Sequence, residues 1–174
     1  MAEPPSVDAD FVAFFTTMLP KAVATARRIT GDRASAEDAA AEGLARAYVR
    51  WSKLRTVSYR EAWVLRVTAN QAIGMYRTRT RRAGILRRQP HPETPAGETG
   101  GAGWDARDRL VGSIRRLPRR QRDVVALRYF SDMSTEQVAA ALGISTGSVK
   151  THLHRAMHTL RQRLDTDTFE GMLE

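Results

Sequence analysis

The sequence contains no cysteine and, within its 174 residues, no apolar run long enough to cross a membrane. The missing cysteines exclude disulfides and thiolate-bound metals. A bilayer span needs about 20 consecutive apolar residues, so no membrane insertion is expected. The N-terminus also lacks the basic and then apolar segments of a secretory signal. We therefore expect a cytoplasmic protein.

Patterns that indicate catalysis or metal binding are scarce as well. No glycine-rich loop with an adjacent lysine precedes a predicted helix, so the sequence predicts no phosphate-cradling loop. Of the four histidines, His154 and His158 have the spacing of a helical metal site, but no third ligand accompanies them. No pair of carboxylates is placed to converge in a pocket. We expect a binding protein rather than an enzyme, with no catalytic residue, cofactor or metal.

Positive charge, in contrast, is abundant. The chain has 28 lysines and arginines against 19 acidic residues, a formal net charge of +9. Such a chain is attracted to polyanions, because neutralising phosphates releases bound counterions. The excess is almost entirely arginine, which also fits a bias in genome base composition.

The segment from Ser134 to Lys150 has the pattern of a helix-turn-helix. Ser134 and Gln137 are spaced as a capping box, and an apolar stripe follows at helical spacing. Gly143 suits the left-handed conformation that ends a helix. Ser145 then caps a second predicted helix.

The second predicted helix of this motif has two distinct faces. Its buried face is predicted to carry Val149, Leu153, Ala156 and Leu160. The opposite face presents Lys150, Thr151, His154 and Arg155. A helix held in this way can enter the major groove of DNA. The alternative is an ordinary helical hairpin whose basic face is simply solvated.

The N-terminal half has helical periodicity from about residue 10. Pro20 either kinks the first helix or divides it in two, and Gly31 and Asp32 close this stretch. Ser35 is the predicted N-cap of the next helix, which runs to about Trp51. An acidic patch is predicted on one side of it, formed by Glu37, Asp38 and Glu42. This patch is either functional or serves helix charge placement and solubility.

A further predicted helix begins near Tyr59 or Glu61 and ends in a run of arginines. Its aromatic, amide and basic residues suit single-stranded or distorted nucleic acid. Trp63, Leu65 and Ile73 are interpreted as core residues in preference to base-stacking ones. Asn70 is interpreted as functional, because an exposed amide does nothing for a core.

Residues 89–104 differ in composition, with proline and glycine and hardly an apolar side chain. Such a segment cannot bury enough surface to order itself, so it is predicted to be a flexible linker. No strand pattern is sustained anywhere. The predicted fold is therefore all-α, with two small helical domains at residues 8–88 and 105–165, the second containing the helix-turn-helix.

Taken together, these features resemble the extracytoplasmic-function (ECF) sigma factors of bacterial RNA polymerase. The segment from Leu117 to Ala156, with its Leu142-Gly143-Ile144-Ser145 turn, is similar to the family's fourth conserved region. Residues 36–51 and 62–77 resemble its second region. The resemblance extends over about residues 10–164 and implies a factor that binds core RNA polymerase and directs promoter recognition, melting and transcription initiation.

The resemblance also implies roles for individual residues and a set of partners. Polymerase contacts would come from Glu37, Asp38 and Glu42, with Ala41 where the family usually has glutamine. Contacts to the melted minus-ten element would come from Arg66, Asn70, Arg77 and Arg79. Contacts to the minus-thirty-five element would come from Ser148, Lys150, Thr151, His154 and Arg155. The implied partners are core polymerase, promoter DNA and an anti-sigma factor.

Two alternatives of another class remain. A stand-alone helix-turn-helix regulator would bind duplex DNA through residues 105–174 alone. A polymerase-binding regulator without promoter specificity would co-purify with the enzyme and not initiate.

Overall fold

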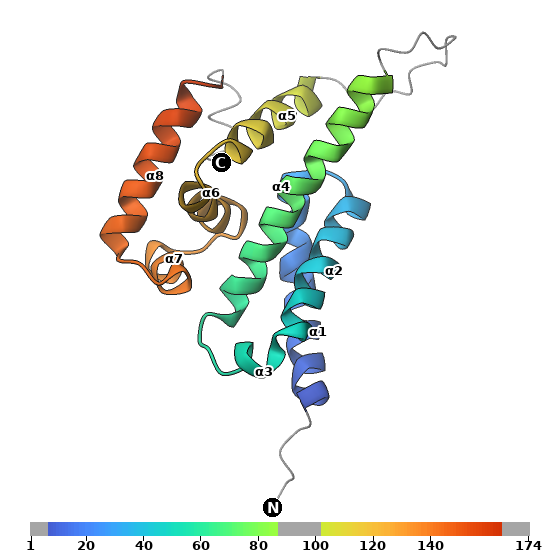
Figure 1. The fold of residues 1–174 in the computed structure, drawn as a ribbon, viewed down its shortest axis with the longest axis vertical. Helices are drawn as coiled ribbons and strands as arrows, with labels where there is room; N and C mark the ends of the chain where they lie inside the picture. Colours follow the sequence, from blue (N-terminus) through green and yellow to red (C-terminus); the bar gives the residue numbers. More distant parts are fainter. Residues whose placement is uncertain (1–6, 87–101, 165–174) are drawn as a thin grey trace, which may run out of the picture.

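The structure, a computed structural model, describes the backbone of residues 7–86 and 102–164 and the side chains of residues 9–75 and 106–164. Within these ranges the chain is built of helices and turns, without a strand. The first four helices are α1 (Val7–Thr30), α2 (Arg33–Val49), α3 (Trp51–Leu54) and α4 (Arg60–Leu86). The others are α5 (Ala102–Arg115), α6 (Arg119–Val125), the π-helical turn η1 (Ala126–Phe130), α7 (Thr135–Leu142) and α8 (Thr146–Arg161). Figure 1 shows α4 between α1 and α2 on one side and α5 to α8 on the other.

Helix α1 continues through Pro20 as a single helix of 24 residues. Proline lacks the N–H that would bond to the carbonyl four residues earlier, in Thr16. Both Pro20 and Thr16 are exposed, so water can reach the freed carbonyl. Of the two alternatives predicted for Pro20, a kink or a division into two helices, the division is not observed.

The start of α2 differs from the prediction. Asp32 is the N-cap, and its Oδ1 accepts a hydrogen bond of 2.8 Å from the backbone N–H of Ser35. Ser35 therefore lies inside the first turn, and the helix begins at Arg33. The prediction of Ser35 as cap was wrong because aspartate is an equally good cap and stands directly after Gly31, whose φ of +77° ends α1.

Helices α1, α2 and α4 pack on one another around small residues. Gly43 of α2 faces Thr68 of α4 so closely that a Cβ on Gly43 would lie 2.2 Å from the Thr68 hydroxyl and 3.4 Å from its Cα. At the far end, Phe11 and Phe14 of α1 pack on the ring of Trp51, with centroids 5.2 and 4.7 Å away. The close approach of α2 to α4 therefore depends on a glycine. The contact of α1 with α3 depends on aromatic rings.

We expect Gly43→Ala to lower the free energy of unfolding by about 1–3 kcal/mol, because the added methyl must push α2 away from α4. The matched control is Gly74→Ala, whose Cβ would meet nothing within 4 Å. That change is expected to be neutral or to stabilise α4 by about 0.5–1 kcal/mol. Urea unfolding of both variants measures the difference. Equal stability of the two variants would contradict the close approach.

The helix-turn-helix forms as predicted from its local signals. The Ser134 hydroxyl accepts from the N–H of Gln137, whose side chain accepts from the N–H of Ser134, which completes the capping box. Gly143 has φ +63° and ends α7 in the left-handed region. Ser145 caps α8 by accepting from the N–H of Ser148. Helix α6 starts at Arg119 and continues into the π-helical turn η1.

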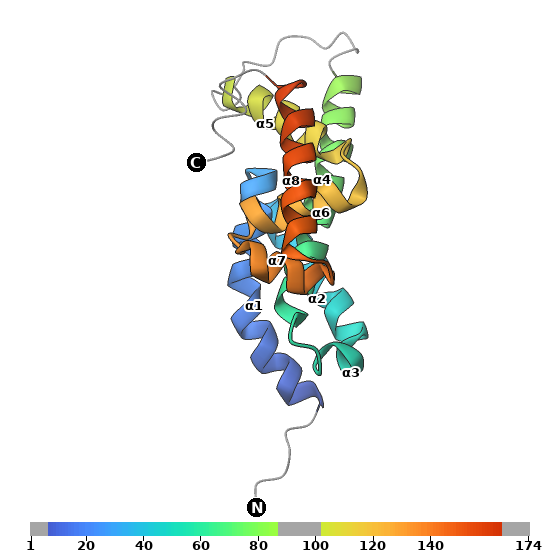
Figure 2. The same cartoon turned by 90° about the vertical axis from the view of Figure 1, so that its left-hand side faces the viewer.

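The two helical halves contact each other in this structure. Helix α4 packs against α5, η1 and α7. Apolar contacts continue across the boundary, since Val64 and Leu65 of α4 belong to one buried cluster with Val124 and Leu127. Arg28 of α1 pairs with Asp132 and also donates to the carbonyl of Phe130. Figure 2, turned by 90°, shows α8 in front, on the outer side of this contact.

No helix in the described part of the chain is long and apolar enough to span a bilayer.

Candidate nucleic-acid interface

Helix α8 presents the basic face that the sequence predicts. Val149, Ala156 and Leu160 are buried, and Leu153 is half-buried. The opposite face is exposed at Lys150, Thr151, His154 and Arg155. Helix α8 itself lies at the outer edge of its half (Figures 1 and 2). Nothing within the described residues has to move before α8 can approach DNA.

Some polar groups of this face are hydrogen-bonded within the protein, and others are available to bind DNA. The Ser148 hydroxyl lies 2.9 Å from that of Ser145 and is part of the cap. The Thr151 hydroxyl donates to the Gly147 carbonyl at 2.9 Å, which leaves its lone pairs as acceptors. Lys150 and Arg155 form no ion pair with any carboxylate among the described residues. Their charges are available for phosphates or for guanine edges.

One acidic residue lies near this face. Hydrogen bonds from its own backbone and from Ser134, together with the positive charges of Lys150 and Arg128, lower the pKa of the exposed Glu136 carboxyl. Glu136 thus stays ionised at neutral pH in the first turn of α7, where the helix dipole favours a negative charge.

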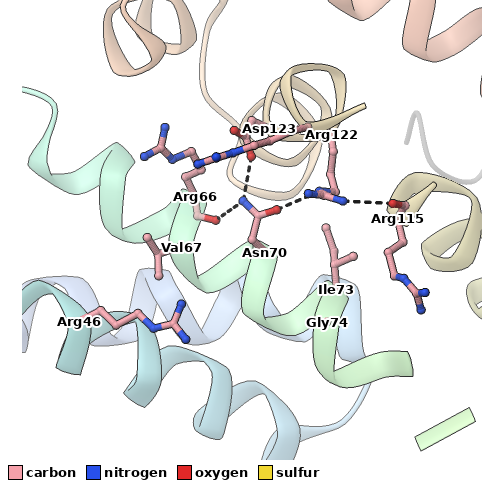
Figure 3. Close-up of a pocket in the computed structure, with 10 residues that line it drawn as sticks. Arg46, Arg66, Val67, Asn70, Ile73, Gly74, Arg115, Arg122 and Asp123 are labelled. Atoms are coloured by element: carbon pink, nitrogen blue, oxygen red, sulfur yellow. Dashed lines mark hydrogen bonds between the residues drawn. The ribbon is translucent and has the colours of Figure 1, made fainter. Parts of the chain in front are cut away.

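The other predicted nucleic-acid surface, on α4, is arranged differently. Asn70 is half-buried, and its amide is fully engaged across the contact between the two halves (Figure 3). Its Nδ2 donates to Asp123 Oδ1 at 2.8 Å and to the Arg66 carbonyl at 3.0 Å. Its Oδ1 accepts from Arg122 Nε at 3.1 Å. The free exposure expected for Asn70 is therefore not observed.

Asp123 was not among the residues singled out from the sequence. It is 2% exposed although it carries a carboxylate, and Asn70 donates to it from 53 positions away in the chain. Its only sequence signal is its position directly before the buried Val124 and Val125, at the start of an apolar helix face. A buried carboxylate needs a hydrogen-bond partner, and the amide of Asn70 supplies one.

The remaining residues of the α4 site are partly outside the described side chains. Arg66 is half-buried and lines the same cavity as Asn70. The backbone of Arg77 and Arg79 belongs to α4, but their side chains lie outside the described residues. Leu65 and Ile73 are buried, which confirms their interpretation as core residues, and Trp63 is half-buried beneath the guanidinium of Arg50.

The acidic patch of α2 is at the surface. Glu37 bonds to Arg33 at 2.6 Å and Glu42 bonds to Arg46 at 2.6 Å, each pair one helical turn apart. The Glu37 carboxylate raises the pKa of Arg33 through this hydrogen bond and through its charge. Asp38 is exposed. Such exposed pairs contribute little to stability, so these carboxylates can exchange their arginines for a partner's basic groups.

Among the described residues, no three histidine, aspartate or glutamate side chains gather as metal ligands would.

Comparison with known families now identifies the class of protein. Residues 14–82 match the family described as Sigma-70 region 2, and residues 107–160 match Sigma-70, region 4. The chain therefore contains, in order, two regions of a sigma-70-type initiation factor. The first region contains α2 and the Asn70 face of α4, and the second contains the helix-turn-helix.

Relatives narrow the class further. The RNA polymerase sigma-E factor of Streptomyces coelicolor is 36% identical over 157 residues, which are 89% of this chain and 86% of the relative. The ECF RNA polymerase sigma factor SigL of Mycobacterium tuberculosis is 34% identical over 142 residues, 80% of each chain. This chain belongs to the ECF sigma factors.

A solved structure has a similar fold. It is the sigma factor RpoE in complex with the anti-sigma factor NepR from Bartonella quintana, with a TM-score of 0.52 and 23% identity. The match covers 91% of this chain and 98% of that one. The likeness supports the all-α arrangement.

Proposed function

We propose that this ECF sigma factor binds core RNA polymerase through α2 and recognises the promoter with α8 and α4. Helix α8 contacts the minus-thirty-five element through Ser148, Lys150, Thr151, His154 and Arg155. Helix α4 contacts the melted minus-ten element through Arg66, Asn70, Arg77 and Arg79. The observation that carries the proposal is the exposed basic face of α8, held outward by a capped helix-turn-helix in a chain of this family.

The polymerase contact is proposed for the exposed acidic side of α2. Asp38 and Glu42 lie one turn apart, and Glu37 adjoins them. A basic surface on the polymerase would replace Arg33 and Arg46 as the partners of these glutamates. Ala41, also exposed, contributes only a methyl group to this side of the helix.

We further propose a division into a first domain at residues 8–88, a linker at 89–104 and a second domain at 105–165. The linker lies mostly outside the described residues, although α5 already begins at Ala102. Two weak DNA-binding modules on one chain raise each other's effective concentration at a promoter, so neither needs high affinity by itself.

The contact between the two halves imposes a condition on this mechanism. The amide of Asn70 cannot bind a base while it bonds to Asp123 and Arg122. The α8 face, in contrast, is exposed in the same arrangement. The chain must therefore separate α4 from α6 before it can hold melted minus-ten DNA. In this proposal, binding to polymerase drives that separation.

The proposed partners are core polymerase and promoter DNA, which places the protein in the cytoplasm and gives it no catalytic step of its own. An anti-sigma factor is a further proposed partner of the free protein. The structural relative is itself a complex with an anti-sigma factor.

Run-off transcription with purified core polymerase and a library of genomic fragments tests the proposal. Promoter-dependent transcripts are expected from the full chain, and none from residues 105–174 alone. A stand-alone regulator would instead bind duplex DNA tightly through residues 105–174 and would not initiate. Co-purification with polymerase without any transcript would indicate a regulator that lacks promoter specificity.

A further inference from the structure

A cavity of about 610 Å³ lies between the two halves of the molecule. Helices α2 and α4 contribute Arg46 and Arg66, while the second half contributes Arg115 and Arg122 (Figure 3). Arg119 of α6 also lines the cavity. The floor includes Val67, Ile73 and Gly74 of α4. Its volume lies within the range of about 300–1,000 Å³ that is typical of small-molecule sites.

The described residues around this cavity carry more positive than negative charge. Asp123 is the one carboxylate among the lining residues, against five arginines, and it is buried in its bond to Asn70. Arg122 is bound to two neutral oxygens, Oδ1 of Asn70 and the carbonyl of Arg115. Of the five guanidinium groups, that of Arg46 pairs with the carboxylate of Glu42, and the other four pair with no carboxylate of the described residues.

Three guanidinium groups have no partner among the described residues. The side chains of Arg66, Arg115 and Arg119 form no hydrogen bond or ion pair with the part of the chain that the structure describes. Like charges brought together from two domains repel each other, which opposes the observed contact between them. A small anion in the cavity would remove this repulsion and could be bonded from both sides, since guanidinium groups bind phosphate oxygens in a planar, bidentate manner.

We propose that this cavity binds a compact oligophosphate, either inorganic or the phosphate chain of a nucleotide, and that the bound anion holds the two halves together. Several adjacent phosphates match the several arginines, whereas a single carboxylate would leave most of them unbound. The bound state keeps Asn70 in its bond to Asp123, away from DNA. Because the ligand needs arginines from both halves, it stabilises the closed arrangement and is released on opening.

The proposal is tested by calorimetric titration of the full chain with inorganic tripolyphosphate, and separately with guanosine and adenosine triphosphates. The variant is Arg115→Gln/Arg119→Gln, which removes two unpaired guanidinium groups and no residue proposed to contact promoter DNA. The control is Arg116→Gln/Arg163→Gln, two exposed arginines outside the cavity with the same loss of charge. The expected result is at least a tenfold weaker binding for the first variant and a change below about threefold for the control.

A second readout follows the two halves directly. The natural chain has no cysteine, so Lys53→Cys and Thr146→Cys place spin labels at two exposed positions without side reactions. Tripolyphosphate is expected to narrow the distance distribution between the labels in the otherwise unaltered chain, and to do so much less when Arg115 and Arg119 are replaced.

The outcomes separate the sources of the ligand. Equal affinity for tripolyphosphate and both nucleotides would indicate that the cavity recognises the phosphate chain alone, as in an inorganic ligand. Tighter binding of one nucleotide would indicate that the cavity also binds its base. Equal weakening by the cavity and control variants would show attraction to net charge only and would overturn the proposal. So would the absence of tripolyphosphate binding together with tight binding of single-stranded DNA by the same arginines. The binding assay contains no polymerase, so it stands or falls independently of the role in transcription.

Discussion

Replacing both Lys150 and Arg155 by alanine is expected to reduce promoter-directed initiation at limiting protein by at least about 30-fold, because each contact to a base or phosphate contributes about 1–3 kcal/mol. Both side chains are exposed on α8 and are not tied to any carboxylate of the described chain. The loss should therefore lie in DNA binding and leave folding intact. Run-off transcription against protein concentration measures it.

The control for this variant is Arg116→Ala/Arg163→Ala, which removes two exposed charges away from the α8 face. Salt dependence gives a further check. Two lost phosphate contacts should lower the slope of log affinity against log salt concentration by about 2, whereas lost base contacts would leave the slope nearly unchanged. Initiation at the parent level by the Lys150/Arg155 variant would remove α8 from promoter recognition.

The helix-turn-helix could be predicted because its determinants are local. The bonds of Ser134 with Gln137 and of Ser145 with Ser148 join residues three positions apart. Gly143 needs only its own backbone conformation. Rules that relate a residue to its near neighbours in the chain suffice for such features, and they also placed Lys150 and Arg155 on the exposed side.

Predictions that depended on distant parts of the chain were less complete. Asn70 was predicted to be exposed, but its amide is bonded to Asp123, which is 53 positions away and on another helix. The Arg28–Asp132 pair spans 104 positions. The apolar periodicity of α1 or α4 does not predict which other helix will pack against it. The arginine-lined cavity could not be predicted for the same reason, because its lining residues come from four different helices.

Local errors had local causes. Ser35 and Asp32 are both acceptable caps, and sequence alone did not choose between them, whereas the left-handed Gly31 fixes the choice in the structure. Pro20 was predicted either to kink the helix or to divide it, and a helix-interior proline leaves one carbonyl without its usual partner. Its exposed position removes that cost.

Asn70→Ala and Asp123→Ala are expected to have the same effect on the free protein and opposite effects on the promoter complex. Each removes the 2.8 Å bond between the two side chains. Loss of one buried hydrogen-bond partner costs about 1–3 kcal/mol, and a difference of that size changes an equilibrium by about 5- to 150-fold. Both variants should therefore favour separation of the halves, seen as a longer and broader distance between spin labels at Lys53→Cys and Thr146→Cys.

On promoter DNA the two variants separate the roles of Asn70. Asp123→Ala leaves the amide free for a base and should speed the formation of strand-separated complexes with core polymerase. Asn70→Ala lacks the amide. Its yield of strand-separated complexes should fall by about 5- to 150-fold, which corresponds to the loss of one contact of about 1–3 kcal/mol. Fluorescence of 2-aminopurine placed in the minus-ten element measures strand separation in both variants.

Asp123→Asn is the matched control, because its Oδ1 still accepts from Asn70. This variant should keep both the label distance of the parent protein and its rate of strand separation. Unchanged strand separation in Asn70→Ala would exclude Asn70 as a contact to the melted strand. An unchanged label distance in Asp123→Ala would show that the apolar contacts of α4 with the second half hold the two halves together by themselves.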